Sequence, residues 1–377
     1  MTEYLERTIT ATVQHDLERK MVFVAGPRQA GKTTFARRLC NLDGKNYDRS
    51  YCNWDIATHR SMIISEEFPA DTDFFILDEI HKYRRWRQVV KGLYDAKPGE
   101  RKIIVTGSAR LDYYRHGGDS LQGRYRFFRL PPFCCRELGE PKRSAFDRLL
   151  AFGPFPEPFL GGSERDARVW SRDYRMRIVE EELRGLEKVM DTALVEKLAM
   201  MLPERVGSPL SINSMKEELQ VAHQTVSRWV TILEKVYMLF RIFPYTLSST
   251  RSVRREAKHY HFDWTGVSDP GPRFENLVAF HLLAWCWRQQ DEQGRDVDLR
   301  YYRDMDRREV DFVITEKNQP VCLIEAKTSN REVSSSLRYL KGRFPSVTAL
   351  QIARDFDDDR MTREGIRLCG WKALWEW

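Results

Sequence analysis

A chain of 377 residues is long enough for two or three domains, and 42% hydrophobic residues support packed cores rather than a disordered or collagen-like tract. The net charge of +7 and the isoelectric point near 9.0 favour a polyanionic partner. Seven cysteines without a C-x-x-C pair argue for reduced thiols and against a disulfide framework or a zinc site. No run of 18 apolar residues occurs, so we expect a soluble, cytoplasmic protein without membrane contact.

The most informative segment is MVFVAGPRQAGKTTFARRL, Met21 to Leu39. It places a glycine-rich loop between an apolar strand, Met21 to Ala25, and a helix. The spacing G-x-x-x-x-G-K-[ST] is that of a phosphate-binding loop, whose N–H groups surround phosphate oxygens at the positive end of the helix. The residues expected to bind ATP are Gly26, Pro27, Arg28, Gln29, Ala30, Gly31, Lys32, Thr33 and Thr34. Lys32 would reach the β- and γ-phosphates, and the Thr33 hydroxyl would hold Mg²⁺.

Two further apolar strands, DFFILDEI (73–80) and KIIVTGSAR (102–110), are separated by a helical stretch at 84–94, which predicts a parallel α/β sheet. Asp78 ends the first of these strands and is expected to position Mg²⁺, while Glu79 beside it is the expected general base for the attacking water. Ser108 is the candidate polar residue between Glu79 and the γ-phosphate, and Thr106 is the alternative.

The middle of the chain changes character at Pro131, Pro132 and the loop GPFPEP (153–158), and residues 167–201 have helical spacing that predicts a lid or linker. Next come a short helix, capped by Ser211 or Ser214 and ending near Leu219, a second helix at about 224–236 and the strand-like YMLFRIFPY. This order fits a winged helix-turn-helix. The second helix would pack through Val226, Trp229, Val230 and Leu233 and expose Gln224, Ser227, Arg228 and Lys235. Contact with DNA and a plain packing role both remain open for this unit.

The order GPRQAGKTT, ILDEIH, TGSAR and SLQGRYRFFRLPP resembles the AAA-type ATPases of the AAA_14 kind, which commonly carry a carboxyl-terminal DUF4143 domain, and GPFPEP is similar to a loop of that family. The resemblance covers most of the chain. It implies that Arg124 serves as an arginine finger or sensor for the transferring phosphoryl group. Because such a finger usually comes from a neighbouring subunit, the resemblance also implies a homo-oligomer, with a hexameric ring as one form.

The carboxyl-terminal segment places Glu275 on a helix, Asp311 on the strand-like stretch 301–315, and Glu325 with Lys327 on the strand 321–329. This order resembles the PD-(D/E)xK nuclease fold. Glu325 and Lys327 are two residues apart on a strand and share one face. Such carboxylates can hold Mg²⁺ against a phosphodiester while the lysine orients the attacking water. The alternative is a DNA-binding or scaffolding module without cleavage.

Basic and aromatic residues before this segment favour nucleic acid over a small substrate, because cations neutralise phosphates and aromatic rings stack on bases. They are Arg251, Arg254, Arg255, Lys258, Tyr260 and Trp264. A solvated charged face with core aromatics is the alternative.

We therefore expect an α/β chain with four parts: a P-loop AAA-type parallel-sheet ATPase domain (1–140), a helical lid (141–206), a winged helix-turn-helix (207–265) and a PD-(D/E)xK nuclease-like α/β domain (266–377). The expected function is an ATP-hydrolysing, DNA-binding motor of the helicase type that remodels or translocates DNA, with branched or recombination DNA suggested by the family resemblance. Two alternatives stay open: an ATP-regulated, metal-dependent DNA endonuclease, and a nucleotide-dependent switch that recruits a protein partner. ATP and Mg²⁺ are the expected cofactors, and DNA is the expected partner.

Overall fold

The computed structural model describes residues 4–69, 71–108, 111, 121–182, 192–246, 256–329 and 332–377. The chain forms two compact units, Met1–Pro132 with Asp291–Gln293 and Phe133–Gln290 with Gly294–Trp377. The finer division into four parts stays a prediction. The predicted lid, helix-turn-helix and nuclease-like segments belong to one unit because a strand from 207–265 joins the sheet of the carboxyl-terminal segment.

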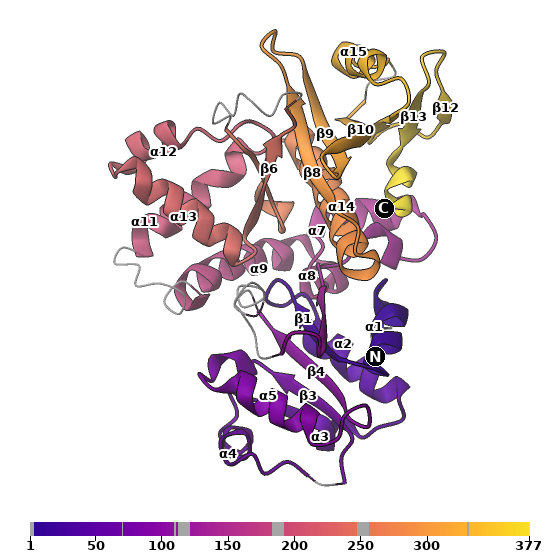
Figure 1. The fold of residues 1–377 in the computed structure, drawn as a ribbon. Coiled ribbons are helices and arrows are strands. Elements are labelled where there is room, and N and C mark those ends of the chain that lie inside the picture. Colours follow the sequence, from indigo (N-terminus) through magenta and orange to yellow (C-terminus); the bar gives the residue numbers. More distant parts are fainter. Residues whose placement is uncertain are drawn as a thin grey trace. The chain divides into compact units, whose positions relative to one another are not determined.

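The first unit is built on a five-stranded parallel sheet with the order β2-β3-β4-β1-β5. Figure 1 labels β1, β3 and β4 of this sheet. Its strands are β1 (Met21–Ala25), β2 (Tyr51–Asn53), β3 (Phe74–Asp78), β4 (Lys102–Gly107) and β5 (Tyr125–Arg129). Its helices are α1 (Thr10–Leu17), α2 (Lys32–Leu42), α3 (Tyr47–Ser50), α4 (Ala57–Ser65) and α5 (Trp86–Asp95). The structure thus confirms the predicted parallel α/β sheet and the predicted bounds of β1.

Every residue of β1 and β3 is buried, which is why both strands are continuous apolar runs in the sequence. One face of the sheet packs through Val22 and Val24 against α1 and α2. The opposite face packs through Phe23 and Leu77 against α4 and α5. These two layers of helices hold the carboxyl ends of the strands, and therefore the loops that follow them, in fixed positions.

The second unit contains an eight-stranded mixed sheet with the order β12-β13-β11-β10-β9-β8-β6-β7. Its strands are β6 (Leu239–Pro244), β7 (Lys258–His261), β8 (Val297–Arg303), β9 (Glu309–Glu316), β10 (Gln319–Lys327), β11 (Thr348–Ala353), β12 (Asp359–Met361) and β13 (Ile366–Gly370). Its helices are α7 (Arg143–Phe152), α8 (Pro156–Gly161), α9 (Glu164–Arg177), α11 (Thr192–Met201), α12 (Ile212–Leu219), α13 (His223–Lys235), α14 (Pro270–Gln293) and α15 (Ser335–Arg343), and a π-helical turn, Ile178–Glu182, follows α9.

The stretch 301–315 was expected to be a single strand and is instead part of the antiparallel pair β8 and β9. The chain turns between them because the Asp304 carboxylate accepts the backbone N–H of Arg308 at 2.9 Å and Arg307 adopts a positive φ of 62°. Since the charged run DMDRR looks equally hydrophilic in an exposed strand and in a turn, periodicity alone did not distinguish the two.

Helices α12 and α13 follow the sequence prediction closely. The Ser211 side chain accepts the N–H of Ser214, so Ser211 is the cap of α12. On α13 the four predicted apolar residues are buried. Of the four residues predicted to be exposed, Gln224, Arg228 and Lys235 are exposed and Ser227 is half-buried. The strands β6 and β7 that follow are antiparallel, but β6 also pairs with β8, so this strand pair forms one edge of the large sheet.

All seven cysteines lie in described segments, and each is buried and free, in agreement with the expected reduced thiols. In the described ranges no helix is both long and apolar enough to cross a membrane.

Candidate functional site

The loop after β1 depends on glycine at two positions. Gly26 has a φ of 153°, and a Cβ atom there would lie 2.3 Å from the carbonyl oxygen of Leu130. Gly31, with a φ of 92°, directly precedes α2. Lys32 is buried, and its Nζ atom donates to the carbonyl oxygens of Gly26 at 3.0 Å and Pro27 at 2.6 Å. The lysine ammonium group therefore lies against the loop backbone at the amino-terminus of α2, where an anion is favoured.

The other loop residues differ in exposure. Ala30 is buried, Arg28 is half-buried, and Gln29 and Thr34 are exposed. The Ala30 carbonyl oxygen accepts a hydrogen bond at 3.0 Å from the buried guanidinium of Arg7, which also donates to carbonyl oxygens just beyond β5. Sequence reasoning missed Arg7, because it precedes the loop by a whole helix and a strand and belongs to no motif.

The buried carboxylate of Asp78, at the end of β3, accepts hydrogen bonds from three hydroxyl groups. The Thr33 Oγ1 and Tyr51 hydroxyl groups donate to Oδ2 at 3.0 and 2.8 Å, and Thr106 Oγ1 donates to Oδ1 at 2.6 Å. Burial, followed by the Asp78 charge, raises the pKa of Tyr51, so this residue remains a hydroxyl donor. Tyr51 was also missed, because β2 has only three residues and its sequence carries no recognisable pattern.

Glu79 follows Asp78 in a strained conformation, with a φ of 56°, and its N–H donates to the Thr106 carbonyl oxygen at 2.9 Å. Its carboxylate lies 3.3 Å from Lys82 Nζ and 3.7 Å from His81 Nε2. Burial alone would lower the pKa of Lys82, but its contacts with Asp55 and Glu79 raise it overall, so Lys82 remains a cation. The expected general base is therefore held by an ion pair with Lys82 in the turn that follows β3.

Ser108 is buried just after β4, and its carbonyl oxygen accepts the N–H of Leu111. Of the two alternatives for the polar residue on this strand, Thr106 is the one whose hydroxyl is seen to bond Asp78. The β4 strand lies between β1 and β3, so its carboxyl end adjoins both the loop and Asp78.

Arg124 lies at the amino ends of the parallel strands, whereas the loop lies at their carboxyl ends. Its carbonyl oxygen accepts the N–H of Met21, the first residue of β1, and its guanidinium pairs with Asp95 at 2.8 Å. The five residues of β1 separate it from the loop by about 16 Å, at roughly 3.3 Å per residue. The sensor role and the finger role of Arg124 both stay predictions.

In the second unit the structure brings together Glu275, Asp311, Glu325 and Lys327, which are far apart in sequence. The Asp311 N–H donates to Glu325 Oε2 at 3.3 Å, and Asp311 Oδ2 accepts the N–H of Ala326 at 3.0 Å. Lys327 Nζ lies 2.7 Å from Glu325 Oε1. Burial, with the Asp311 charge next, raises the pKa values of both Glu275 and Glu325. The sequence thus correctly grouped these residues.

The same cluster also contains a buried lysine. In the described part of the chain, no three histidine, cysteine, aspartate or glutamate side chains are arranged to hold a metal ion. Instead, the ammonium group of Lys258 lies among the carboxylates, 2.7 Å from Glu309 and 3.3 Å from Glu275.

The predicted basic and aromatic surface is wrong for three of its residues. Lys258, Tyr260 and Trp264 are fully buried, so they cannot contact phosphates or bases. The aromatic rings are core residues, and Lys258 belongs to the carboxylate cluster. The remaining members, Arg251, Arg254 and Arg255, lie outside the described residues.

Family comparisons divide the chain into three matched regions. Residues 18–139 match AAA_14, described as an AAA domain. The first unit thus contains most of the region that is similar to an AAA domain. Residues 143–266 and 270–366 match two domains of unknown function, DUF8612 and DUF4143. The carboxyl-terminal DUF4143 match agrees with the resemblance found in the sequence.

The curated relatives are distant in sequence, but the matched regions cover most of both chains. An uncharacterized protein of Mycobacterium tuberculosis is 24% identical, covering 92% of this chain and 78% of that protein. An uncharacterized protein of Methanocaldococcus jannaschii is 22% identical, covering 90% of this chain and 82% of its own length. Among solved structures, a RuvB mutant from Thermogota maritima is 16% identical with a TM-score of 0.28, covering 64% of this chain and 89% of its own.

The residues of the AAA domain fit ATP with Mg²⁺. Gly26 leaves no room for a side chain, the Lys32 ammonium lies on the loop, and a hydroxyl and a carboxylate adjoin each other at Thr33 and Asp78. The loop and Lys32 would hold the phosphates, and Thr33 and Asp78 would hold Mg²⁺, which when bound neutralises phosphate charge.

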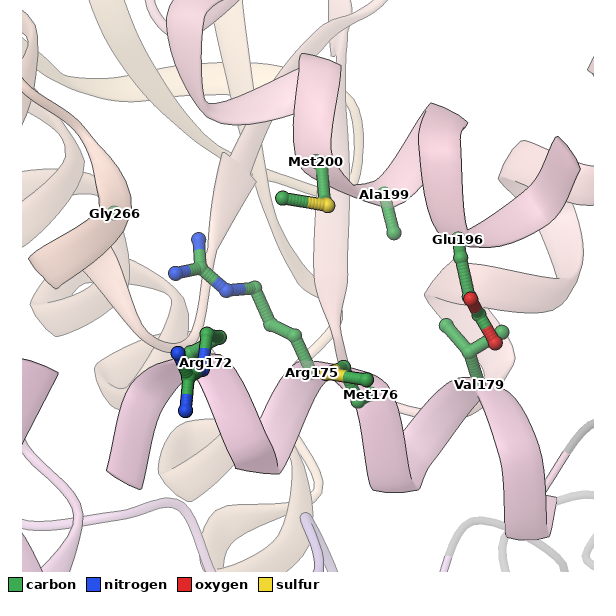
Figure 2. Close-up of a pocket in the computed structure, with 8 residues that line it drawn as sticks. All are labelled: Arg172, Arg175, Met176, Val179, Glu196, Ala199, Met200 and Gly266. Atoms are coloured by element: carbon green, nitrogen blue, oxygen red, sulfur yellow. The ribbon is translucent and has the colours of Figure 1, made fainter. Parts of the chain in front are cut away.

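A separate hollow of about 290 Å³ lies in the second unit between α9 and α11 (Figure 2). Its lining is largely apolar, with Met176 and Val179 on one side and Ala199 and Met200 on the other. The Met176 and Met200 side chains are strongly exposed, at 52% and 68%. No sequence motif indicated this hollow, because its walls come from α9 and the turn after it, from α11 and from Gly266, which are far apart in the sequence.

Proposed function

We propose that this protein is a cytoplasmic ATPase that hydrolyses ATP at the loop of its AAA domain and uses hydrolysis to remodel or move along DNA. The observation that carries the ATPase part is the placement of Asp78, whose buried carboxylate is bonded to both Thr33 and Thr106. Such bonds fix the orientation of a metal-binding carboxylate beside the phosphate loop. Glu79, the next residue along the chain, is the carboxylate that we assign as general base.

The steps assigned to this chain's residues follow from that geometry. The loop and Lys32 bind and orient the phosphates, and hydrolysis requires the Glu79 carboxylate to accept a proton from the attacking water. In the present arrangement Lys82 pairs with that carboxylate. Productive binding must therefore redirect Glu79 from Lys82 toward the water.

The DNA part of the proposal is supported by charge and by one helix surface. The chain carries a net charge of +7, and α13 exposes Gln224, Arg228 and Lys235 after a tight turn from α12. This is the side-chain chemistry that contacts phosphates and base edges. A homo-oligomer, in which Arg124 acts on nucleotide bound by a neighbouring copy, is part of the same proposal.

A second candidate is a nucleotide-dependent switch that recruits a protein. The apolar hollow between α9 and α11 favours it, because exposed methionines such as Met176 and Met200 suit adaptable protein contacts. Metal-dependent DNA cleavage, the third possibility, is not favoured, because the ammonium group of Lys258 lies among the carboxylates that would hold the metal ion.

The ATPase rate in the presence of different DNA forms tests the proposal. We expect one form among single-stranded, duplex and four-way DNA to stimulate phosphate release, and Lys32→Ala to abolish it. Arg228→Glu should weaken DNA binding and reduce its salt dependence by about one unit of slope. Arg165→Glu is the matched control, since Arg165 is an exposed arginine on α9 with 84% of its side chain accessible. Absence of DNA binding at low salt would favour the switch instead.

A further inference from the structure

Lys258 is the feature of the second unit that the sequence pattern did not predict. It is the first residue of β7, and its side chain is charged yet fully buried. Its Nζ atom lies 2.7 Å from Glu309 Oε1, 3.3 Å from Glu275 Oε1 and 3.7 Å from Asp311 Oδ1. A single ammonium group therefore faces three carboxylates, one from α14 and two from β9.

The carboxylate oxygens of Asp311 and Glu325 also face donor groups of the protein. Both oxygens of Asp311 are engaged, Oδ1 near Lys258 and Oδ2 by the N–H of Ala326. Both oxygens of Glu325 are engaged as well, Oε2 by the N–H of Asp311 and Oε1 by Lys327. Divalent cations bind in proteins through carboxylate oxygens, and in this structure each of these four oxygens already faces a backbone N–H or a lysine ammonium group.

Glu275 is held in the same way. The Tyr260 hydroxyl donates to Glu275 Oε1 at 2.7 Å, the oxygen that also faces Lys258. The other oxygen, Oε2, lies near Gly207, where a Cβ atom would be 3.0 Å from it, and the Glu275 side chain stays 17% exposed.

We propose that Lys258 is the built-in cation of this cluster, and that its ammonium group takes the place of the divalent metal ion expected from the Glu275, Asp311, Glu325 and Lys327 pattern. Buried carboxylates are unfavourable unless a positive charge and hydrogen bonds compensate them. Lys258 and Lys327 supply that charge from within the chain. The cluster then connects β7, α14 and β9 as a structural element and does not support metal-dependent cleavage of DNA.

Calorimetric titration of the nucleotide-free, full-length chain with Mn²⁺ tests this. The wild type and Asp311→Asn should bind the same number of Mn²⁺ ions, because there is no binding at Asp311 to lose. Lys258→Met keeps an unbranched side chain, one atom shorter, and removes its charge, so it should gain one Mn²⁺ site per chain. That site should disappear in the double variant Lys258→Met/Asp311→Asn.

Lys102→Met is the matched control. Lys102 lies in the other unit and also pairs with two carboxylates, Glu18 at 2.7 Å and Asp43, so its loss should leave the Mn²⁺ stoichiometry of the second unit unchanged. A Mn²⁺ site in the wild type that Asp311→Asn removes would overturn the proposal, and this comparison needs no Lys258 variant to fold. A folded Lys258→Met protein without the extra site would also overturn it.

Discussion

Replacing Thr106 by valine removes one hydroxyl group from the nucleotide site and keeps the shape of the side chain. This hydroxyl is fully buried and donates to Asp78 Oδ1 over 2.6 Å. Hydrogen bonds to charged groups contribute about 1.5–3 kcal/mol, so we expect Thr106→Val to lower the stability of the AAA domain by about 2 kcal/mol. Because Asp78 also loses an orienting contact, the Mg²⁺ concentration for half-maximal ATPase activity should rise by about tenfold, which corresponds to about 1.4 kcal/mol.

Hydrogen exchange of the β3 and β4 amides measures the stability of this unit alone, and a Mg²⁺ titration of phosphate release measures the second effect. Thr106→Ser retains the hydroxyl and should keep the wild-type Mg²⁺ requirement. If the valine variant matches the wild type in both measurements, the Thr106 hydroxyl does not position Asp78, and the reasoning is refuted.

Two further substitutions probe the loop and the second unit. Gly26→Ala would bring a methyl group to 2.3 Å from a backbone carbonyl oxygen, so it should cost about 1–3 kcal/mol and abolish ATP binding in a fluorescent-nucleotide assay. Gly44→Ala, at a φ of 69° with no atom within 4 Å, should retain binding, and equal losses would contradict the steric argument. Burial lowers the pKa of His281 to about 4, and the neutral ring donates from Nδ1 to Leu277 and accepts at Nε2 from Cys135. A lowered histidine pKa gives stability that is present above its unfolded value and is lost as the pH falls toward 4, so between pH 7 and pH 4 the wild type should lose about 3 kcal/mol more than His281→Gln. Denaturant unfolding at several pH values measures this, and identical pH curves would disprove it.

The nucleotide site could be predicted from sequence wherever its determinants are local. The loop is encoded by spacing within nine residues, and Asp78 by its place at the end of an apolar strand. Tyr51 and Arg7 could not be found in this way, because each reaches the site only through the tertiary fold. Their contacts depend on which strands become neighbours, and no short pattern specifies that.

The second unit shows that the burial of a charged residue is hard to predict from sequence. Periodicity predicted the buried face of α13, and strand spacing correctly grouped Glu325 with Lys327. A lysine near aromatic residues was nevertheless assigned to a nucleic-acid surface, although Lys258 and Tyr260 are buried. Charge in a sequence normally indicates exposure, and the compensating carboxylates come from segments that lie farther along the chain.

The central claim is that this loop hydrolyses ATP with Glu79 as the general base. Its most direct test is the rate of ATP hydrolysis by the Glu79→Gln variant. The substitution preserves size and removes the proton acceptor, so ATP binding should persist while the rate of phosphate release falls by about 10²–10⁴. Lys32→Ala should instead lose ATP binding itself. A Glu79→Gln protein that binds ATP and hydrolyses it at the wild-type rate would contradict the account.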